Sequence, residues 1–337
     1  MKIIRTDSEL ETPIIDKTLK DWGHELVLLP DHVSEDKLCE EIMDCDLLLM
    51  CYTPVTKRVI DAASKLKAIV KYGVGIDAIN ILAANAKDIV VVNIPEYAEE
   101  TVAEGAFAML IALAKKMPLL QEGMNLKSWV WPESKYLGLD IAEKTVGIVG
   151  CGKIGSSMAR MAGLGFRARV IGYDPYKTKY EMAAHGIIKY NNLIEMLREC
   201  DFISLHAVLN EETKHLIGEK ELSVIKPSAI LINSARGALI DELALVKAFE
   251  NNQLAGLGLD VFSKEPLNQK DHPLRELFKM KQVILFPHLT FYTVEAMERL
   301  EKETLERCKE VIENSPIVIK SKDLRLANQS SLNAVYK

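Results

Sequence analysis

Short apolar runs alternate with amphipathic stretches along this chain, and that alternation restricts the fold more than any other feature of the sequence. In residues 2–95 the apolar runs are KIIRT, ELVLLP, DLLLMCY, KAIVKYG and IVVVNIP, separated by stretches such as PIIDKTLKDW and TKRVIDAAS. Short strands that alternate with helices favour a parallel sheet covered by helices on both faces. The first part of the chain is therefore predicted to be an α/β unit.

A second, larger series of alternating elements follows a long helical pattern at residues 99–116. Its predicted strands are TVGIVG, ARVIGYD, FISLH, AILINSA, AGLGLDVF and VILFPH, which indicate a doubly wound unit at residues 98–287. The last helical pattern, at 293–314, is expected to return to the first unit, which then comprises residues 1–97 and 288–337. Two units also suit a length of 337 residues, because single cores stop growing at about 250–300 residues. The tail from Ile317 shows no pattern.

Composition excludes several classes of protein. The net charge is -6, without a basic cluster, which argues against a nucleic-acid partner. The first residues, MKIIRTDSEL, do not resemble a signal peptide, and no apolar run approaches the roughly 20 residues of a membrane span. We therefore expect a cytoplasmic protein that does not bind membranes. The six cysteines form no CxxC pair and do not cluster with histidines, so the sequence predicts neither a metal site nor a disulfide framework. They are Cys39, Cys45, Cys51, Cys151, Cys200 and Cys308.

A glycine loop directly after a predicted strand indicates a dinucleotide-binding site. Residues 150–155 read GCGKIG, the pattern GxGxxG. Gly150 is expected to form the turn, Gly152 to let the backbone approach a pyrophosphate, and Gly155 to let the helix pack on the strand. The strand ARVIGYD then ends in Asp174, whose carboxylate is expected to bind the adenosine ribose hydroxyls and to repel a 2′-phosphate. The predicted cofactor is therefore NAD rather than NADP.

Three further predicted strands are each followed by a polar side chain suited to catalysis. Arg236 follows AILINSA, Glu265 follows LDVFSK, and His288 follows VILFP. Ligands of open parallel sheets bind outside the carboxyl ends of the strands, so these side chains are expected to converge there. A cation, a proton donor and a carboxylate that tunes the donor are the groups that reduction of a keto acid requires.

These segments resemble the signatures of a known family. The stretches LINSARGALIDELAL, GLGLDVFSKEPL and FPHLT, with the glycine loop, are similar to motifs of the D-isomer-specific 2-hydroxyacid dehydrogenases, and the similarity runs from about Leu47 to Glu313. The resemblance implies a flavodoxin-like substrate domain made of both chain ends, with a Rossmann NAD-binding domain inserted. It also implies hydride transfer between a small D-2-hydroxy acid and its 2-keto acid. A homodimer built around the Rossmann domain is expected by analogy, with Trp129 and Trp131 as candidate contacts.

The same resemblance assigns roles to individual residues. Arg236 would bind the substrate carboxylate and keto oxygen, His288 would be the acid and base, and Glu265 would orient His288 and favour its protonated form. The other residues implied to bind substrate are Lys71, Gly73, Val74, Gly75 and Tyr292. The residues implied to bind cofactor are Thr101, Gly150, Gly152, Lys153, Ile154, Gly155, Asp174, His206, Val208, Thr213, Ser234, Ala235, Arg236, Asp260 and His288.

Two departures from the family pattern bear on the substrate. Met50-Cys51 stands where phosphoglycerate-type members carry Arg-Ser, which places 3-phosphoglycerate low among the candidates. Phe291 and Tyr292 stand where most relatives have small residues, and they either narrow the pocket or pack at the domain interface. Pyruvate, glyoxylate and hydroxypyruvate are the leading candidates. Oxidation of phosphite and an NAD-sensing, corepressor-like binding protein are the alternatives.

Overall fold

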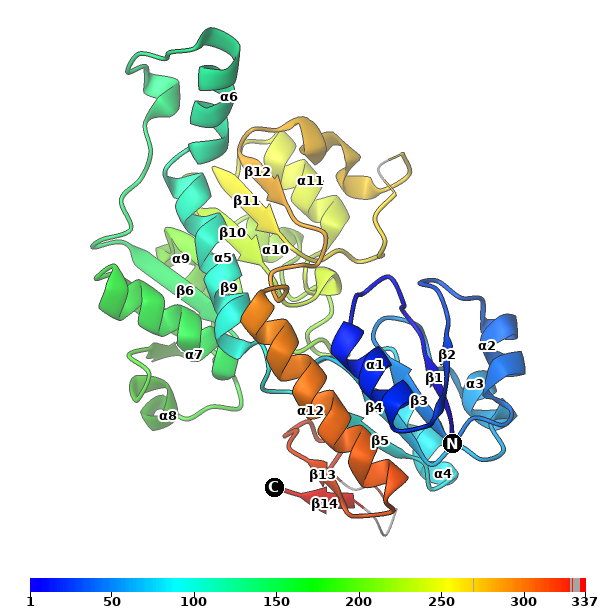
Figure 1. Cartoon of the computed structure of the whole chain (residues 1–337). Helices are drawn as coiled ribbons and strands as arrows, with labels where there is room; N and C mark the ends of the chain where they lie inside the picture. The colour runs from blue at the N-terminus through cyan, green and yellow to red at the C-terminus, as the bar shows by residue number, and fades with distance from the viewer. Residues whose placement is uncertain (269, 328, 330–333) are drawn as a thin grey trace. The chain divides into compact units, whose positions relative to one another are not determined.

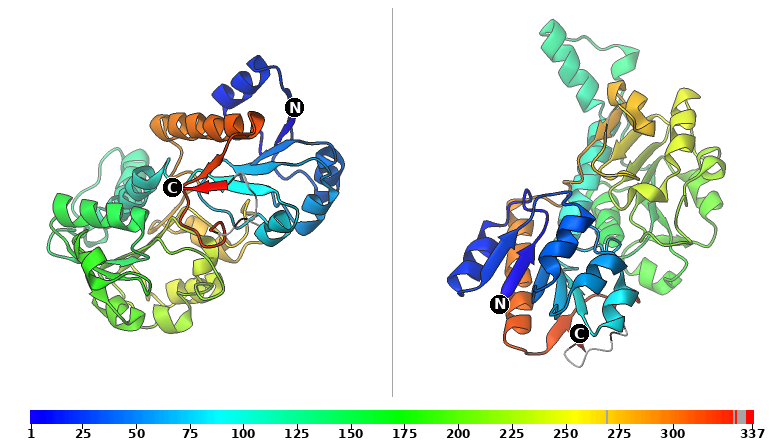
Figure 2. Two further views of the ribbon diagram at one scale, coloured as in Figure 1. Left: turned by 90° about the horizontal axis from the view of Figure 1, so that it is seen from below. Right: turned by 90° about the vertical axis from the view of Figure 1, so that its right-hand side faces the viewer.

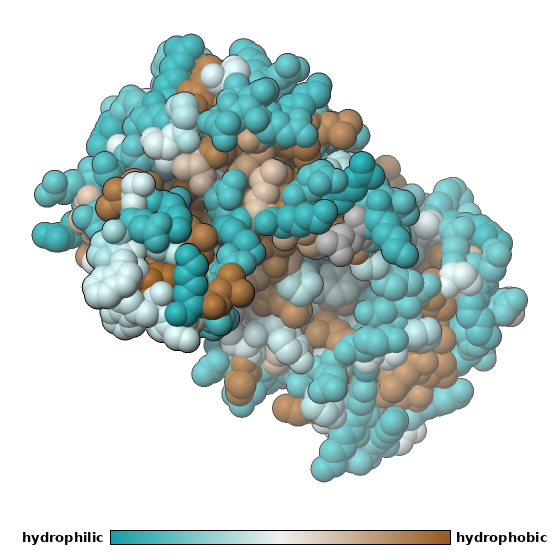
Figure 3. All heavy atoms as spheres, turned by 90° about the horizontal axis from the view of Figure 1, so that it is seen from above, coloured by the Kyte–Doolittle hydropathy of each residue, from teal (hydrophilic) through white to brown (hydrophobic). Residues whose placement is uncertain are grey.

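Residues 1–98 and 293–337 form the first of two units in the computed structural model of the chain, and residues 99–292 form the second (Figure 1). The structure describes residues 1–268, 270–327, 329 and 334–337. None of the helices in these ranges is both long and apolar enough to span a membrane. Hydrophilic side chains cover most of the face drawn in Figure 3, with smaller hydrophobic patches between them.

The first unit is built on a five-stranded parallel sheet in the order β2-β1-β3-β4-β5. This order is the flavodoxin-like one, as predicted. Every residue of β3, β4 and β5 is buried, which explains why these strands appear in the sequence as continuous apolar runs. The strands are β1 (Lys2–Arg5), β2 (Glu25–Leu28), β3 (Leu47–Met50), β4 (Ala68–Lys71) and β5 (Val90–Asn93).

Helices cover both faces of this sheet. The last long helix packs on α1 and against β4, so it returns to the first unit as predicted, and α2, α3 and α4 form a row on the opposite face (Figure 2). The helices are α1 (Pro13–Asp21), α2 (Glu35–Ile42), α3 (Lys57–Ala62), α4 (Ile81–Ala86) and α12 (Val294–Ile312).

The tail is more regular than the sequence indicated. Strands β13 (Ile317–Ile319) and β14 (Ala334–Tyr336) pair in parallel, and Gln329 exchanges hydrogen bonds of 2.7 Å with the backbone of Val91. Strands of three residues are too short to leave an alternating pattern, which is why they were not predicted.

The second unit contains a seven-stranded parallel sheet in the order β12-β11-β10-β9-β6-β7-β8. As in a Rossmann fold, β7 and β8 follow on one side of β6 and β9 lies on its other side. Strands β10 to β12 continue the sheet beyond β9. Only β8, at the edge, was not predicted, because its three half-exposed residues form no apolar run. The strands are β6 (Thr145–Val149), β7 (Arg169–Tyr173), β8 (Ile188–Tyr190), β9 (Phe202–Leu205), β10 (Ile230–Asn233), β11 (Gly256–Leu259) and β12 (Val283–Leu285).

The helix predicted at residues 99–116 is divided in the structure. Helix α5 (Glu99–Ala114) packs on β10 and β11, and α6 (Met117–Lys127) follows after Lys116, which has a φ of 55°. Pro118 explains the break, because it lacks the N–H that would donate to the carbonyl of Ala114 in a continuous helix, and its ring would clash with that carbonyl. The remaining helices are α7 (Lys153–Arg160), α8 (Lys179–Ala183), α9 (Leu193–Glu199), α10 (Glu219–Leu222) and α11 (Glu242–Glu250), with short helices η1 (Ser134–Tyr136), η2 (Met161–Gly165), η3 (Gly237–Leu239) and η4 (Pro273–Lys279).

The boundary at which the chain returns from the second unit to the first also differs from the expected one. Residues 288–292 belong to the second unit, whereas the sequence placed the boundary after Pro287. The reason is the buried Asp260, whose carboxylate accepts hydrogen bonds from the amides of Leu289 and Thr290 at 2.8 and 3.1 Å. This side chain fastens the segment after β12 to the end of β11, and no sequence pattern reveals such a contact.

Candidate functional site

The glycine loop has the geometry that a bound dinucleotide requires. Gly150 has a φ of +87°, and a Cβ there would lie 2.5 Å from the backbone nitrogen of Ala207. At Gly155 a Cβ would lie 2.1 Å from the carbonyl oxygen of Gly150, so only glycine lets α7 approach the end of β6 this closely. A Cβ at Gly152 would meet nothing within 4 Å. The helix amino terminus therefore faces open space, where backbone N–H groups are able to bind phosphate oxygens.

Asp174 lies at the end of β7, beside this loop. One carboxylate oxygen accepts from the amide of Cys151 at 2.9 Å, and the other accepts from the amide of Tyr176 at the same distance. The carboxylate is thus fixed against the glycine loop. A carboxylate oxygen has two lone pairs, so both oxygens keep capacity for a ribose hydroxyl.

Other predicted cofactor residues lie on three segments of the second unit, namely α7, α5 and the end of β9. Lys153 forms an ion pair of 2.8 Å with Glu99, next to Ile154, and Thr101 is buried in the first turn of α5. After β9, the ring of His206 accepts from or donates to the Ser204 hydroxyl at 2.8 Å, while its Nδ1 is buried without a hydrogen-bond partner.

Burial lowers the pKa of His206 to about 4, so this imidazole is neutral near neutral pH. The turn that follows His206 carries two more predicted cofactor residues, Val208 and Thr213. The Thr213 hydroxyl donates to the Val208 carbonyl at 2.6 Å and therefore closes the turn, and the Val208 side chain is exposed.

The loop that carries Arg236 is shaped by Asn233, a residue that sequence reasoning did not select. The Asn233 side chain donates to the Arg236 carbonyl at 2.9 Å and accepts from the Ala235 amide at 3.0 Å. The Arg236 guanidinium donates to the Ala235 carbonyl at 2.7 Å. Ser234 is buried, and its hydroxyl has no hydrogen-bond partner. Asn233 is the last residue of β10, and a buried amide at a strand end is the signal that would have identified it.

Glu265 and His288 form a close pair. The Nδ1 of His288 lies 2.7 Å from the Glu265 carboxylate, and the other Glu265 oxygen accepts from the Phe262 amide at 2.8 Å. Burial alone would raise the pKa of Glu265, but the hydrogen bond and charge of His288, the Phe262 amide and the charge of Arg236 together hold that pKa below its usual value. Glu265 is therefore a carboxylate at neutral pH. The structure thus brings His288 and Glu265 together.

The backbone at His288 is constrained. Its φ is 59°, in the left-handed region that few residues other than glycine adopt. Asp260 holds the next two residues, and the Thr290 hydroxyl also donates to it at 2.5 Å. Burial raises the pKa of the Asp260 carboxyl. The resemblance implies that Asp260 binds the cofactor, and in the structure its carboxylate fixes the segment that follows His288.

The two aromatic residues after this segment behave differently. Phe291 is buried, and its ring meets the His288 ring edge-on with centroids 6.4 Å apart. The Tyr292 side chain is 44% exposed. Phe291 therefore packs against the His288 ring, whereas the Tyr292 side chain is accessible to solvent.

The predicted substrate loop lies in the first unit, at the carboxyl end of β4. The Asn93 side chain donates to the Val74 carbonyl at 2.6 Å and supports the loop between Gly73 and Gly75. Lys71 is only 6% exposed, and its ammonium lies 3.1 Å from the Cys51 thiol. Among the described residues, no carboxylate forms an ion pair with Lys71. A buried cation of this kind is able to bind an anion.

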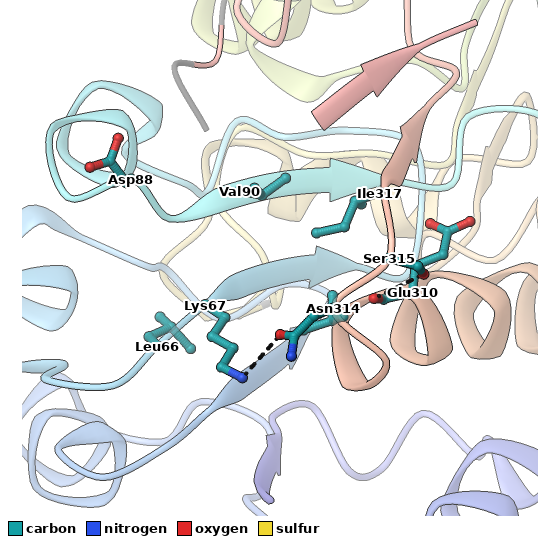
Figure 4. A pocket seen from close by; sticks show the side chains of 9 residues that line it. Leu66, Lys67, Asp88, Val90, Glu310, Asn314, Ser315 and Ile317 are labelled. Carbon is teal, nitrogen blue, oxygen red and sulfur yellow. Dashed lines mark hydrogen bonds between the residues drawn. The ribbon is translucent and has the colours of Figure 1, made fainter. Parts of the chain in front are cut away.

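A pocket of about 320 Å³ lies at the amino-terminal ends of β4 and β5, whereas the predicted substrate loop follows the carboxyl end of β4 (Figure 4). Lys67 and Asn314 point toward each other there, 3.4 Å apart. None of the predicted site residues lines this pocket. Within the ranges that the structure describes, no group of three or more His, Cys, Asp or Glu side chains is arranged to hold a metal ion, and all six cysteines are free.

The strand order and the glycine loop define a class of protein, namely proteins of two α/β units of which one has the dinucleotide-binding fold. The chain belongs to the D-isomer specific 2-hydroxyacid dehydrogenase family. Residues 107–290, most of the second unit, match that family's NAD binding domain.

Three similar proteins illustrate the range of this family. The chain is 36% identical to D-3-phosphoglycerate dehydrogenase of Methanocaldococcus jannaschii over 93% of its own length but only 57% of that protein's. It is 37% identical to glyoxylate reductase of Korarchaeum cryptofilum, over 84% of this chain and 85% of that protein. The crystal structure of D-lactate dehydrogenase from Aquifex aeolicus, complexed with NAD and lactic acid, has a TM-score of 0.83 at 31% identity, covering 93% and 96% of the two chains.

Proposed function

We propose that this protein interconverts a small D-2-hydroxy acid and its 2-keto acid, with NAD(H) as the cofactor. The observation that carries the proposal is the contact of 2.7 Å between His288 and Glu265, in the unit that also holds the glycine loop. A histidine paired with a carboxylate is a typical general acid and base. Bound NADH would supply the hydride that reduces C2 of the keto acid.

His288 supplies the proton in this proposal. Its Nδ1 is engaged with Glu265, so Nε2 is the nitrogen that would donate to the keto oxygen during reduction. Glu265 stabilises the protonated ring and fixes its orientation, because the carboxylate is itself held by the Phe262 amide. In the reverse direction, the neutral ring would accept the proton of the hydroxyl group.

Arg236 and Lys71 are the cations proposed to recognise the acid. A guanidinium binds a carboxylate through two parallel hydrogen bonds and would polarise the neighbouring keto group. The Lys71 ammonium, buried beside the backbone of Gly73, is proposed to add a second positive charge. Recognition by the Arg236 guanidinium favours a substrate with a carboxylate next to its carbonyl.

Small substrates are favoured over 3-phosphoglycerate. Met50 and Cys51 are buried and carry no charge that would bind a phosphate. The similar glyoxylate reductase is matched over most of its length, whereas the chain spans 57% of the phosphoglycerate dehydrogenase it resembles. Glyoxylate, pyruvate and hydroxypyruvate are therefore the proposed substrate group.

The test is a panel of 2-keto acids assayed by NADH oxidation, with the His288→Ala variant as the control. We expect turnover of at least one of the three small acids and its loss in the variant. Reduction of NAD+ by 3-phosphoglycerate or phosphite, measured in the reverse assay, without turnover of any of the keto acids would replace the proposed substrate class. NADH binding without turnover of any compound would contradict an enzyme and would favour an NAD-sensing protein.

A further inference from the structure

The loop after β11 supports all three proposed catalytic side chains. Asp260, at its start, holds the amides that follow His288, and Glu265, at its end, bonds to the His288 ring. Gly237, next to Arg236, packs on the middle of this loop so closely that a Cβ there would lie 1.9 Å from the carbonyl carbon of Phe262. The position of this loop therefore determines the geometry of the whole set.

Glu242 fixes the middle of the loop from helix α11. One of its carboxylate oxygens accepts from the Ser263 amide at 2.8 Å, and the other accepts from the Ser263 hydroxyl at 2.5 Å. Glu242 is 7% exposed. Ser263 itself is exposed, so both hydrogen bonds are partly buried, with the shielded end at the carboxylate. Hydrogen bonds to a charged acceptor are stronger than those between neutral groups.

Capping of α11 does not account for this buried carboxylate. Asp241 is the N-cap residue, and its side chain already accepts from the amides of Leu243 and Ala244, both at 3.1 Å. Glu242 instead reaches out of its own helix to the loop that carries Glu265.

His272 adds a second contact to the same carboxylate. Its Nδ1 accepts from the Leu274 amide at 3.3 Å, so the ring hydrogen is on Nε2 in the neutral tautomer. That Nε2 is buried without a hydrogen-bond partner and lies 3.6 Å from Glu242. The His272 ring therefore lies beside the Glu242 carboxylate, just beyond hydrogen-bonding distance.

We propose that Glu242 is a positioning residue for catalysis, which holds the Asp260–Glu265 loop through Ser263 and thereby aligns Glu265 with His288. The inference rests on the proposed function for its kinetic consequence, although its geometric part does not depend on turnover. Glu242 itself touches neither substrate nor cofactor in this proposal.

The test compares Glu242→Met, which removes both acceptors, with Glu242→Gln, which keeps one. We expect kcat for keto-acid reduction to fall about tenfold or more in the Met variant, because displacements of about 1 Å at a catalytic pair have effects of that order, while KM for NADH stays within about twofold. The Gln variant should lie between the Met variant and the wild type.

A histidine NMR titration provides a readout that does not require turnover. With Glu265 displaced, His288 should release its proton at a lower pH in Glu242→Met, since Asp260 and Arg236, whose charges also act on the pair, do not substitute for Glu265. The His288 signal is identified among those of the seven histidines by its absence in a His288→Gln variant.

Glu250→Met, on the exposed end of the same helix, is the matched control and should leave both readouts unchanged. If Glu242→Met does not fold, Ser263→Ala removes one of the two bonds and should produce a smaller change in the same direction. An unchanged His288 titration in a folded Glu242→Met or Ser263→Ala variant overturns the inference, whatever happens to kcat. A wild type that reduces no keto acid overturns only the proposed function.

Discussion

At the scale of single residues, the roles of His288 and Arg236 predict different kinetic defects. His288→Ala should lower kcat by about 10²–10⁴-fold with little effect on NADH binding, because a general acid acts only as charge develops on the keto oxygen. Arg236→Ala should lower kcat and also raise KM for the keto acid, since the guanidinium holds the carboxylate before and during the reaction. Steady-state kinetics and NADH titration measure both effects. Equal defects in the two variants would contradict the separate roles.

His206 predicts acid sensitivity of the folded protein. Its pKa is about 4 in the folded chain, whereas an unperturbed histidine titrates at about 6.5. Between these values the unfolded chain binds a proton that the folded chain does not, so stability should fall as pH decreases from 7 to 5, by about 1–2 kcal/mol from this residue. Urea unfolding of the wild type and of His206→Gln at both pH values measures the difference. The variant should show a smaller loss, and an equal loss would rule out His206 as the source.

The sequence identified the residues whose chemistry stands at a strand end, and it missed those that act through the backbone. Glu265 and His288 were selected because each follows an apolar run, and the structure brings them together. Asn233 and Glu242 were not selected, because an amide that shapes a turn and a carboxylate that binds a distant serine leave no periodic signal.

At the scale of elements, the end of β7 and the glycine loop predict cofactor preference. The fixed carboxylate of Asp174 should give NADH a kcat/KM at least about tenfold higher than NADPH, since it would repel a 2′-phosphate. Asp174→Ser should reduce that ratio, mainly by improving use of NADPH. Equal efficiencies in the wild type would show that the carboxylate does not contact the ribose.

Helix α12 predicts a second element-scale effect. The buried carboxylate of Glu301 accepts from the amides of Ile14 and Ile15, in the first turn of α1, at 2.8 and 3.0 Å. Glu301→Ala should lower the free energy of unfolding by about 1–3 kcal/mol, because the buried amide of Ile15 and the partly buried amide of Ile14 lose their acceptor. Glu298→Ala, exposed on the same helix, is the control and should change stability by less than about 0.5 kcal/mol. Similar losses of stability in Glu301→Ala and Glu298→Ala would contradict the role of Glu301 as the acceptor for the amides of α1.

The elements that the sequence predicted correctly are those that stand out as a continuous apolar run or as a long helical period, and they include the three-residue strand β12. Buried runs such as Val90–Asn93 and the 19-residue helix α12 were located to within a few residues. The three-residue strands β8, β13 and β14 were missed, and the break before α6 depended on one proline within an otherwise helical pattern.

At the scale of the whole molecule, an exposed apolar surface predicts self-association. Helix α6 extends away from the sheet of the second unit (Figure 1). The helix and the segment that follows it expose several large apolar side chains. Leu126 is 76% exposed and Trp131 73%, and the rings of Trp129 and Trp131 meet edge-on. Such surfaces usually bind a partner, and twofold homodimers are the commonest soluble oligomers.

Light scattering at micromolar concentration should therefore report a dimer. Replacing Trp129 and Trp131 together by serine should produce a monomer, while Tyr180→Ser, at another exposed aromatic residue of the same unit, should not. A monomeric wild type would refute the proposal.

The insertion of one unit into the other also fixes an order of events during synthesis on the ribosome. The bond between Glu301 and Ile14 joins residues 287 positions apart. Residues 1–98 leave the ribosome without α12, whereas residues 99–292 emerge as a continuous unit that is able to fold first. The nascent first unit consequently exposes the face of β4 that α12 later covers, until α12 has been synthesised. Translation rate and chaperones that recognise apolar surface should therefore affect the yield of this protein through residues 1–98, although those residues are synthesised before the whole second unit.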